Sequence, residues 1–202
     1  MKTTVIMAAL GGLLLASAVE ARNECKVTVC HLPGGDATKV HAIEVGVSAL
    51  DAHLAHGDFM GFQGSCYVLL PEAVHLDEAE EACVESGGHL VSIHSQEEND
   101  YVGTLADMAT MNPGRCWIGA IGDGPMGDFC SGSAGIYEWT DGSAWDYENW
   151  RDSTSEPNGC GTAPPKDAVM FFALSQGANY GWNDVRADRL NTSGYVCKFG
   201  GP

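Results

Sequence analysis

Glu138-Trp139-Thr140-Asp141-Gly142-Ser143 opens the stretch of sequence that decides the fold. The stretch continues through Asn149-Trp150 to Glu156-Pro157-Asn158, and it closes on Trp182-Asn183-Asp184. Carboxylate and amide side chains gather in two clusters, each beside a residue that stiffens the backbone. Because hard cations take carboxylate and carbonyl oxygens as ligands, this pattern predicts a calcium site.

Length and charge limit the classes of function. The 202 residues suffice for one well-packed domain and a smaller piece. The formal net charge is −17 at pH 7, whereas nucleic-acid binding depends on lysine and arginine side chains that neutralise phosphates. The charge therefore argues against a nucleic-acid partner and suits cation binding, although acidity for solubility alone is an equal alternative.

Residues 1–21 have the pattern of a secretory signal peptide. Lys2 gives a positive start, Val5–Ala16 is apolar, and small residues around Ala18 and Ala21 offer cleavage sites. The apolar run is shorter than the roughly 20 residues that a membrane span needs, so we expect a secreted, extracellular protein without a span. All eight cysteines follow this segment, and an even number in an exported chain favours disulfides.

Residues 22–63 predict a small module rich in cysteine and histidine, to which the sequence assigns no established function. Lys26–Val29 is strand-like, and Val40–Val47 alternates in polarity. Ser48–His56 has the pattern of a short helix that Ser48 caps.

The module carries a candidate transition-metal site made of Cys30, His31, His41, His53 and His56. On the expected helix His53 and His56 are three residues apart, so both rings can point to the same side. Thiolate and imidazole groups are ligands for zinc or copper. The alternative is that Cys30 lies in a disulfide and the histidines hydrogen-bond within a small core.

A second region, residues 64–202, has a different pattern. Four segments read as regular elements: a strand at Cys66–Leu70, an amphipathic helix at Asp77–Ser86, a strand at His89–Ile93, and a helix from Ser95 to about Met111. Ser95 and Glu98 are expected to form a capping box at the start of the last helix.

Eight short motifs in this region occur in the order of a known family. They are Ser65-Cys66-Tyr67, Glu78-Ala79-Glu80 with Cys83, Gly88-His89-Leu90-Val91-Ser92-Ile93, Trp117-Ile118-Gly119, Glu138-Trp139-Thr140-Asp141-Gly142, Glu156-Pro157-Asn158, Trp182-Asn183-Asp184 and Tyr195-Val196-Cys197. From about Gly64 to Phe199 the chain resembles a C-type lectin-like domain. The resemblance implies an α+β fold of two helices, small antiparallel sheets and a long ligand-binding loop region.

The resemblance also implies a disulfide between Cys83 and Cys197. A second bridge of the family is missing, because Ala168 and Ala187 stand at its two positions. A replacement is expected among the extra cysteines Cys116, Cys130 and Cys160. The pairing of the six remaining cysteines stays open: Cys25, Cys30, Cys66, Cys116, Cys130 and Cys160.

Four residues match the family's calcium ligands one by one: Glu156, Asn158, Asn183 and Asp184. Each can give one oxygen to Ca²⁺ while its other polar atom meets a sugar hydroxyl. Pro157 is a candidate for a cis peptide bond that aims its neighbours at one point. In the family, the order Glu-Pro-Asn goes with mannose-type sugars, whose 3- and 4-hydroxyls are equatorial.

One departure bears on calcium affinity. Lys166-Asp167 stands where the family usually has a glutamate before an aspartate, so Lys166 opposes the metal charge and Asp167 becomes a further candidate ligand. We therefore expect weak calcium binding, with a Kd of roughly 0.1 to 1 mM. The tryptophans Trp117, Trp139, Trp150 and Trp182 are expected to be core residues, because aromatic area is usually buried.

The sequence favours a secreted, calcium-dependent lectin that binds glycans or glycoproteins. The alternative is a lectin-like domain that binds proteins or surfaces, or builds an extracellular assembly by self-association, without reading sugar. A less favoured hypothesis makes the histidine module a copper or zinc site. Asn191-Thr192-Ser193 is a candidate glycosylation sequon. No catalytic constellation is recognisable, so we do not expect an enzyme.

Overall fold

The structure is a computed structural model. It describes residues 26–108, 115–122, 137–151, 156–157, 167–172, 179–187 and 192–200, and of residues 167–172 and Arg186 only the backbone. Cys25, Cys130, Asn158, Cys160, Lys166 and Asn191 therefore lie outside the described residues. Among the helices that are described, none combines the length and the apolar character needed to cross a membrane.

The N-terminal residues form a three-stranded antiparallel sheet of order β2-β1-β3. Its elements are β1 (Lys26–His31), β2 (His41–Gly46), helix α1 (Leu50–Ala55) and β3 (Phe59–Met60), with 3₁₀ turns at Pro33–Gly35, Ala37–Lys39 and Val47–Ala49. Ser48 lies inside the last 3₁₀ turn, and the N-cap of α1 is Ala49, which makes no side-chain cap. The prediction that Ser48 caps this helix was therefore wrong.

The rest of the described chain forms a seven-stranded sheet. Its path is β4-β10-β6-β8-β9, with β5 paired to β10 and β7 paired to β6. The strands are β4 (Cys66–Leu70), β5 (His89–Leu90), β6 (Arg115–Gly122), β7 (Tyr137–Trp139), β8 (Asp167–Phe172), β9 (Trp182–Arg186) and β10 (Gly194–Phe199). Among the paired strands that the structure describes, only β10 and β6 run parallel. With helices α2 (Leu76–Glu85) and α3 (Gln96–Asp107), this confirms the α+β class.

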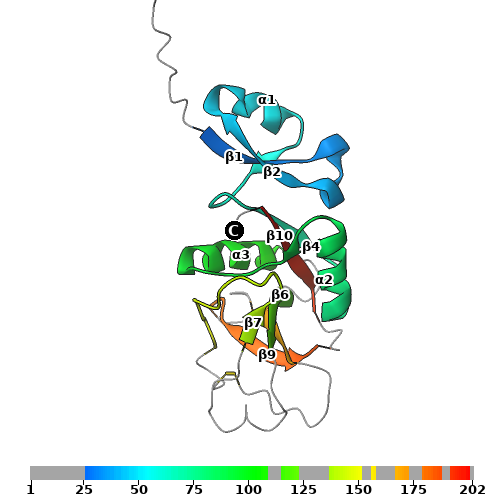
Figure 1. The fold of residues 1–202 in the computed structure, drawn as a ribbon, viewed down its shortest axis with the longest axis vertical. Coiled ribbons are helices and arrows are strands. Elements are labelled where there is room, and N and C mark those ends of the chain that lie inside the picture. The colour runs from blue at the N-terminus through cyan, green and yellow to red at the C-terminus, as the bar shows by residue number, and fades with distance from the viewer. Residues whose placement is uncertain are drawn as a thin grey trace, which may run out of the picture.

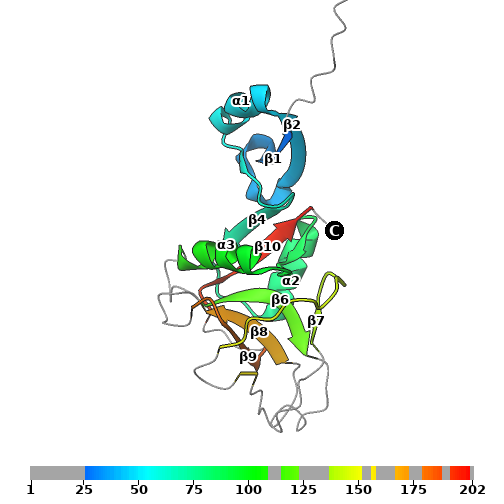
Figure 2. The same cartoon turned by 90° about the vertical axis from the view of Figure 1, so that its left-hand side faces the viewer.

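Figures 1 and 2 show the small sheet at one end of the molecule, next to β4 and the end of β10, with β7 and β9 towards the other end. A disulfide between Cys30 and Cys66 joins β1 to β4. The Ser65 hydroxyl donates a 2.8 Å hydrogen bond to the carbonyl of Gly200, just after β10. The disulfide thus ties the N-terminal sheet to the first strand of the larger sheet, and the Ser65 bond ties the start of that strand to the end of β10.

Strand β10 separates two apolar clusters. Side chains alternate between the two faces of a strand. Cys197 faces the cluster that contains Cys83 of α2, whereas Val196 faces the cluster that contains Val102 of α3. The Cys83–Cys197 disulfide that the resemblance implies is present in the first cluster. By the same alternation, Lys198 lies on the α3 face.

Two elements of the larger region are shorter than the sequence pattern indicates. Strand β5 ends at Leu90, and helix α3 ends at Asp107. The capping box at the start of α3 is half formed. Ser95 Oγ accepts a hydrogen bond from the backbone of Glu98 at 3.1 Å, but the Glu98 carboxylate accepts from the backbone of His94 at 2.8 Å.

Cys116 on β6 is a free, fully buried thiol, so a replacement disulfide that includes Cys116 is ruled out. Burial raises the pKa of this thiol to about 12. Since the thiolate is the reactive form, we expect native Cys116 to react with iodoacetamide at pH 8 about a thousandfold more slowly than an exposed thiol. Mass mapping of its peptide before and after unfolding in guanidinium checks this. Labelling in the native state at the rate of the unfolded chain contradicts it.

Candidate calcium and sugar site

Strand β9 places two of the predicted ligands, and Trp182 fixes the strand. The Trp182 side chain is fully buried, and its Nε1 donates to Asn99 Oδ1 of α3 at 2.8 Å. Its backbone exchanges hydrogen bonds with residues 149–151, with Trp182 N to Asn149 O at 2.7 Å and Arg151 N to Trp182 O at 3.0 Å. The next two residues, Asn183 and Asp184, therefore follow a rigid anchor.

The Asn183 side chain lies against the Glu156 carboxylate. Turned so that its nitrogen faces this carboxylate, the amide donates to Oε2 at 2.8 Å and also contacts Oε1. Turned the other way, the amide oxygen meets the carboxylate oxygens, and these oxygens repel one another unless a cation lies between them. The peptide bond between Glu156 and Pro157 is cis.

Asp184 is adjacent to this pair but more deeply placed. Its side chain is buried, and Tyr137 OH donates to its Oδ2 at 3.3 Å. Neighbouring strand residues point to opposite faces, which accounts for the different surroundings of Asn183 and Asp184. Tyr137 is a site neighbour that the sequence reasoning missed, because nothing in its local pattern marks it.

The described residues thus bring together Glu156 and Asn183, with Asp184 beside them on the same strand. Asp167 is described by its backbone alone, which pairs with Arg186 of β9 and with Gly122 of β6. Asn158 is outside the described residues. The Glu156 carboxylate and the Asn183 amide oxygen are ligand types that Ca²⁺ prefers, so this pair fits a calcium ion, whereas the buried Asp184 carboxylate contacts Tyr137.

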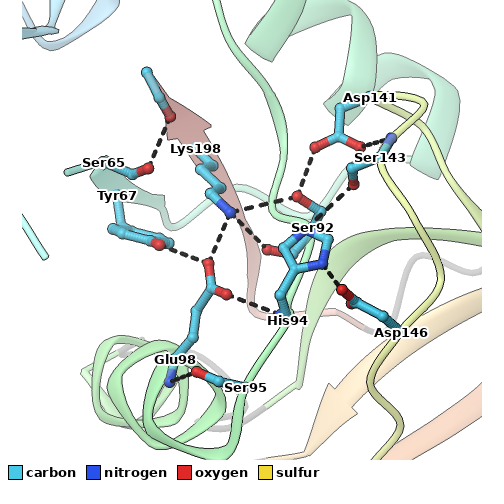
Figure 3. Close-up of polar contacts among 11 residues, drawn as sticks. Ser65, Tyr67, Ser92, His94, Ser95, Glu98, Asp141, Ser143, Asp146 and Lys198 are labelled. Carbon is cyan, nitrogen blue, oxygen red and sulfur yellow. Dashed lines mark hydrogen bonds and ion pairs between the residues drawn. The ribbon is translucent and has the colours of Figure 1, made fainter. Parts of the chain in front are cut away.

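A buried ion pair fixes α3 against β10 (Figure 3). Lys198 Nζ lies 2.8 Å from Glu98 Oε1 and 3.2 Å from the carbonyl of Ser92, and the two charged side chains are 10% and 4% exposed. Tyr67 OH donates to the same Glu98 oxygen at 2.6 Å. Burial and the neighbouring Glu98 raise the pKa of Tyr67, so this hydroxyl stays protonated and acts as a donor.

A cleft of about 460 Å³ opens beside this ion pair. Its lining is Gly87, Gly88, His89, Asp141, Gly142, Ser143, Lys198 and Gly200. None of these residues is a predicted calcium ligand. A sugar site of this chemistry is shallow and depends on metal coordination rather than on enclosure, so we place the candidate site at Glu156 and Asn183 and not in the cleft.

The comparisons with known proteins bear on this geometry. The Lectin C-type domain profile matches residues 72–199. Snaclec 3 of Sistrurus catenatus edwardsii is 34% identical over 140 residues, which is 68% of this chain and 79% of that protein. The chain belongs to the C-type lectin domain family.

Two solved C-type lectin folds resemble the structure. One is the cow carbohydrate-recognition domain of CD23, crystallised in the presence of a GlcNAc2Man3 oligosaccharide, with 30% identity, a TM-score of 0.51, and coverage of 70% of this chain and 92% of that one. The other is a calcium-independent type II antifreeze protein, with 25% identity, a TM-score of 0.53, and coverage of 70% and 90%. Membership of the family therefore establishes the fold but not the ligand.

The histidine module lies outside the C-type lectin match. Cys30 is bonded to Cys66, so the prediction of Cys30 as a metal ligand was wrong, since a disulfide sulfur offers no thiolate. His31 and His53 converge on Asp58, the ring of His41 lies 5.3 Å from that of His31, and His56 is exposed at the end of α1. Asp58 was missed, because its burial depends on tertiary packing.

Proposed function

We propose that this protein is a secreted, calcium-dependent lectin that recognises mannose-type sugars on glycans or glycoproteins. The observation that carries the proposal is the contact between the Glu156 carboxylate and the Asn183 amide. Two segments far apart in the sequence bring oxygen-bearing side chains together beside Asp184. Such a set of oxygens suits a hard cation.

Glu156 and Asn183 each carry a second polar atom of a type that can meet a sugar hydroxyl. Bound calcium supplies the positive charge that attracts two vicinal hydroxyls. Glu156 offers a carboxylate oxygen that accepts a hydrogen bond from a hydroxyl, and Asn183 offers an NH₂ group that donates one. With Asn158, which the Glu-Pro-Asn order adds, this alternation of donors and acceptors suits the equatorial 3- and 4-hydroxyls of mannose-type sugars.

Glu156→Gln tests the calcium site. The glutamine keeps an amide oxygen but removes one negative charge, so we expect calcium affinity to fall about tenfold or more, because charge count tunes such sites. Isothermal calorimetry measures the affinity, and retention on mannose-agarose, eluted with EDTA, measures sugar binding. Glu138→Gln is the matched control, since Glu138 is exposed on β7 and should bind like the wild type. Equal calcium binding by both variants, or none by the wild type at several millimolar, contradicts the proposal.

A second function is binding of proteins or surfaces without calcium or sugar. The likeness to a calcium-independent type II antifreeze protein supports it, as does Lys166 at a position where the family usually has glutamate. The same column separates the two functions, because calcium-dependent sugar binding is lost on chelation. Failure of the wild type to bind mannose-agarose, with capture of a protein or solid surface that survives EDTA, favours this second function.

We also propose that residues 22–63 form a module distinct from a lectin domain at 64–202. A shallow, solvent-exposed site binds one sugar weakly, and several copies acting together raise the overall affinity through effective concentration. A module at one end of the molecule (Figure 1) is placed to attach or assemble such copies. No catalytic role is part of this proposal.

A further inference from the structure

Three segments of the N-terminal sheet bring two imidazoles and one carboxylate together. His31 ends β1, His53 lies on α1, and Asp58 follows that helix. Asp58 Oδ2 is 2.8 Å from Nδ1 of His31 and 2.7 Å from Nδ1 of His53. The ligand atoms of these three residues all lie within 4.8 Å of one another. Within the described part of the chain, this is the one group of three or more His, Cys, Asp or Glu side chains close enough to hold a metal ion.

Asp58 is held in place as a buried anion. Its side chain is 1% exposed, and its second oxygen, Oδ1, accepts a hydrogen bond from the backbone of Leu32 at 2.9 Å. A buried carboxylate is stable when a positive charge balances it. A divalent cation between the three groups supplies such a charge.

The ligand types select the metal. Two imidazole nitrogens and one carboxylate oxygen are ligands that zinc accepts, with a fourth position left for water. Zinc–ligand distances of about 2.0 to 2.2 Å place the ligand atoms of a tetrahedral site roughly 3.3 Å apart. The present contacts are hydrogen bonds, so binding requires the groups to separate by about half an ångström while the imidazoles lose the protons they donate.

The surroundings allow that movement. The side chains of His31 and His53 are 36% and 26% exposed, so both rings have room to move and zinc has access from solvent. The exposed His41 contacts His31 edge-on, and its Nδ1 lies 3.1 Å from the Lys39 carbonyl. Because a carbonyl oxygen can only accept a hydrogen bond, His41 Nδ1 is the donor in this contact. In the neutral ring the other nitrogen, Nε2, therefore carries the lone pair.

We propose that His31, His53 and Asp58 bind one zinc ion in the N-terminal module. The site is independent of the proposed lectin function. It differs from the site expected from the sequence, because Asp58 replaces the Cys30 thiolate and because His41 and His56 are left out. The alternative is a hydrogen-bond clamp in which Asp58 joins β1 to α1 and no metal binds.

Calorimetric titration of the EDTA-stripped, dialysed full chain with zinc chloride tests the site. We expect one zinc per chain, and we expect His53→Ala to weaken binding about 100-fold or more. His56→Ala is the matched control, because it removes an imidazole from the same helix end without touching the group of three. Circular dichroism checks that both variants fold, and His53→Gln replaces His53→Ala where that variant does not.

A second readout needs no variant. Cobalt added to the stripped wild type should give the intense visible bands of a tetrahedral site, and zinc should remove them. Zinc should also raise the Tm by mass action. Glu156→Gln should bind zinc like the wild type, so failure of the calcium site leaves this result unaffected. The proposal is overturned if the wild type takes up no zinc at about 0.1 mM, or if the His53 and His56 variants bind zinc equally.

Discussion

Lys198→Met is expected to lower the free energy of unfolding by about 3 to 5 kcal/mol, because it removes one partner of a buried ion pair. Lys198 Nζ lies 2.8 Å from Glu98 Oε1, and both side chains are almost fully buried. Methionine restores the apolar stem of lysine but leaves the Glu98 carboxylate in the interior without its cation. Two donors remain, the Tyr67 hydroxyl and the His94 backbone amide, and neither carries a full charge.

Urea denaturation at pH 7 measures this loss. Lys39→Met is the matched control, because Lys39 pairs with Asp36 at 2.9 Å on the surface, where the lysine side chain is 66% exposed. Exposed pairs contribute about 0 to 1 kcal/mol, so the control should change stability little. A loss of less than about 1 kcal/mol in Lys198→Met argues that Glu98 does not depend on its partner.

The double variant Lys198→Met with Glu98→Gln separates charge from packing. If the penalty comes from an unpaired carboxylate, neutralising Glu98 should recover part of the stability that Lys198→Met loses. The two residues touch, so their effects should not add, and the cycle of single and double variants gives the coupling. A double variant as unstable as the sum of the two singles contradicts the ion-pair explanation.

Glu98 also shows what local sequence could and could not predict. The spacing of Ser95 and Glu98 predicted a helix start, and α3 begins at Gln96 with Ser95 as its cap. The partner of the Glu98 carboxylate is Lys198, which is 100 residues away in sequence and lies beside it because β10 is an interior strand of the sheet that packs against α3. Propensity fixes the helix, but long-range packing decides which partner its charged residue takes.

The same limit applies to the two metal-binding hypotheses. Ordered motifs located Glu156 and Asn183, and the structure brings these two side chains into contact. In the N-terminal module, residue type alone grouped Cys30 with the histidines. The Cys30–Cys66 disulfide depends on β1 and β4 lying side by side at these two residues, and the burial of Asp58 depends on the path of the chain after α1. Neither has a local signal, so sequence could name the histidines but not their partner.

Replacing both Cys83 and Cys197 with alanine is expected to cost about 4 to 5 kcal/mol of stability. The bridge closes a sequence separation of 114 residues, and chain entropy makes a cross-link of that span worth about 4 to 5 kcal/mol. Because typical domains are stable by only about 5 to 15 kcal/mol, this is a large fraction of the total. Urea denaturation of the oxidised wild type and of the double variant measures the difference.

Replacing Cys30 and Cys66 with alanine is the comparison. This bridge spans 36 residues, for which the same relation gives about 4 kcal/mol, so loop length alone predicts similar losses. The locations differ, because Cys83–Cys197 joins α2 to the interior strand β10, whereas Cys30–Cys66 ties the N-terminal sheet to the edge strand β4. We therefore expect the first variant to lose the whole fold in one transition and the second to release residues 26–60 first, which limited proteolysis detects. Equal, global unfolding of both variants would mean that the N-terminal sheet and the lectin fold are one cooperative unit.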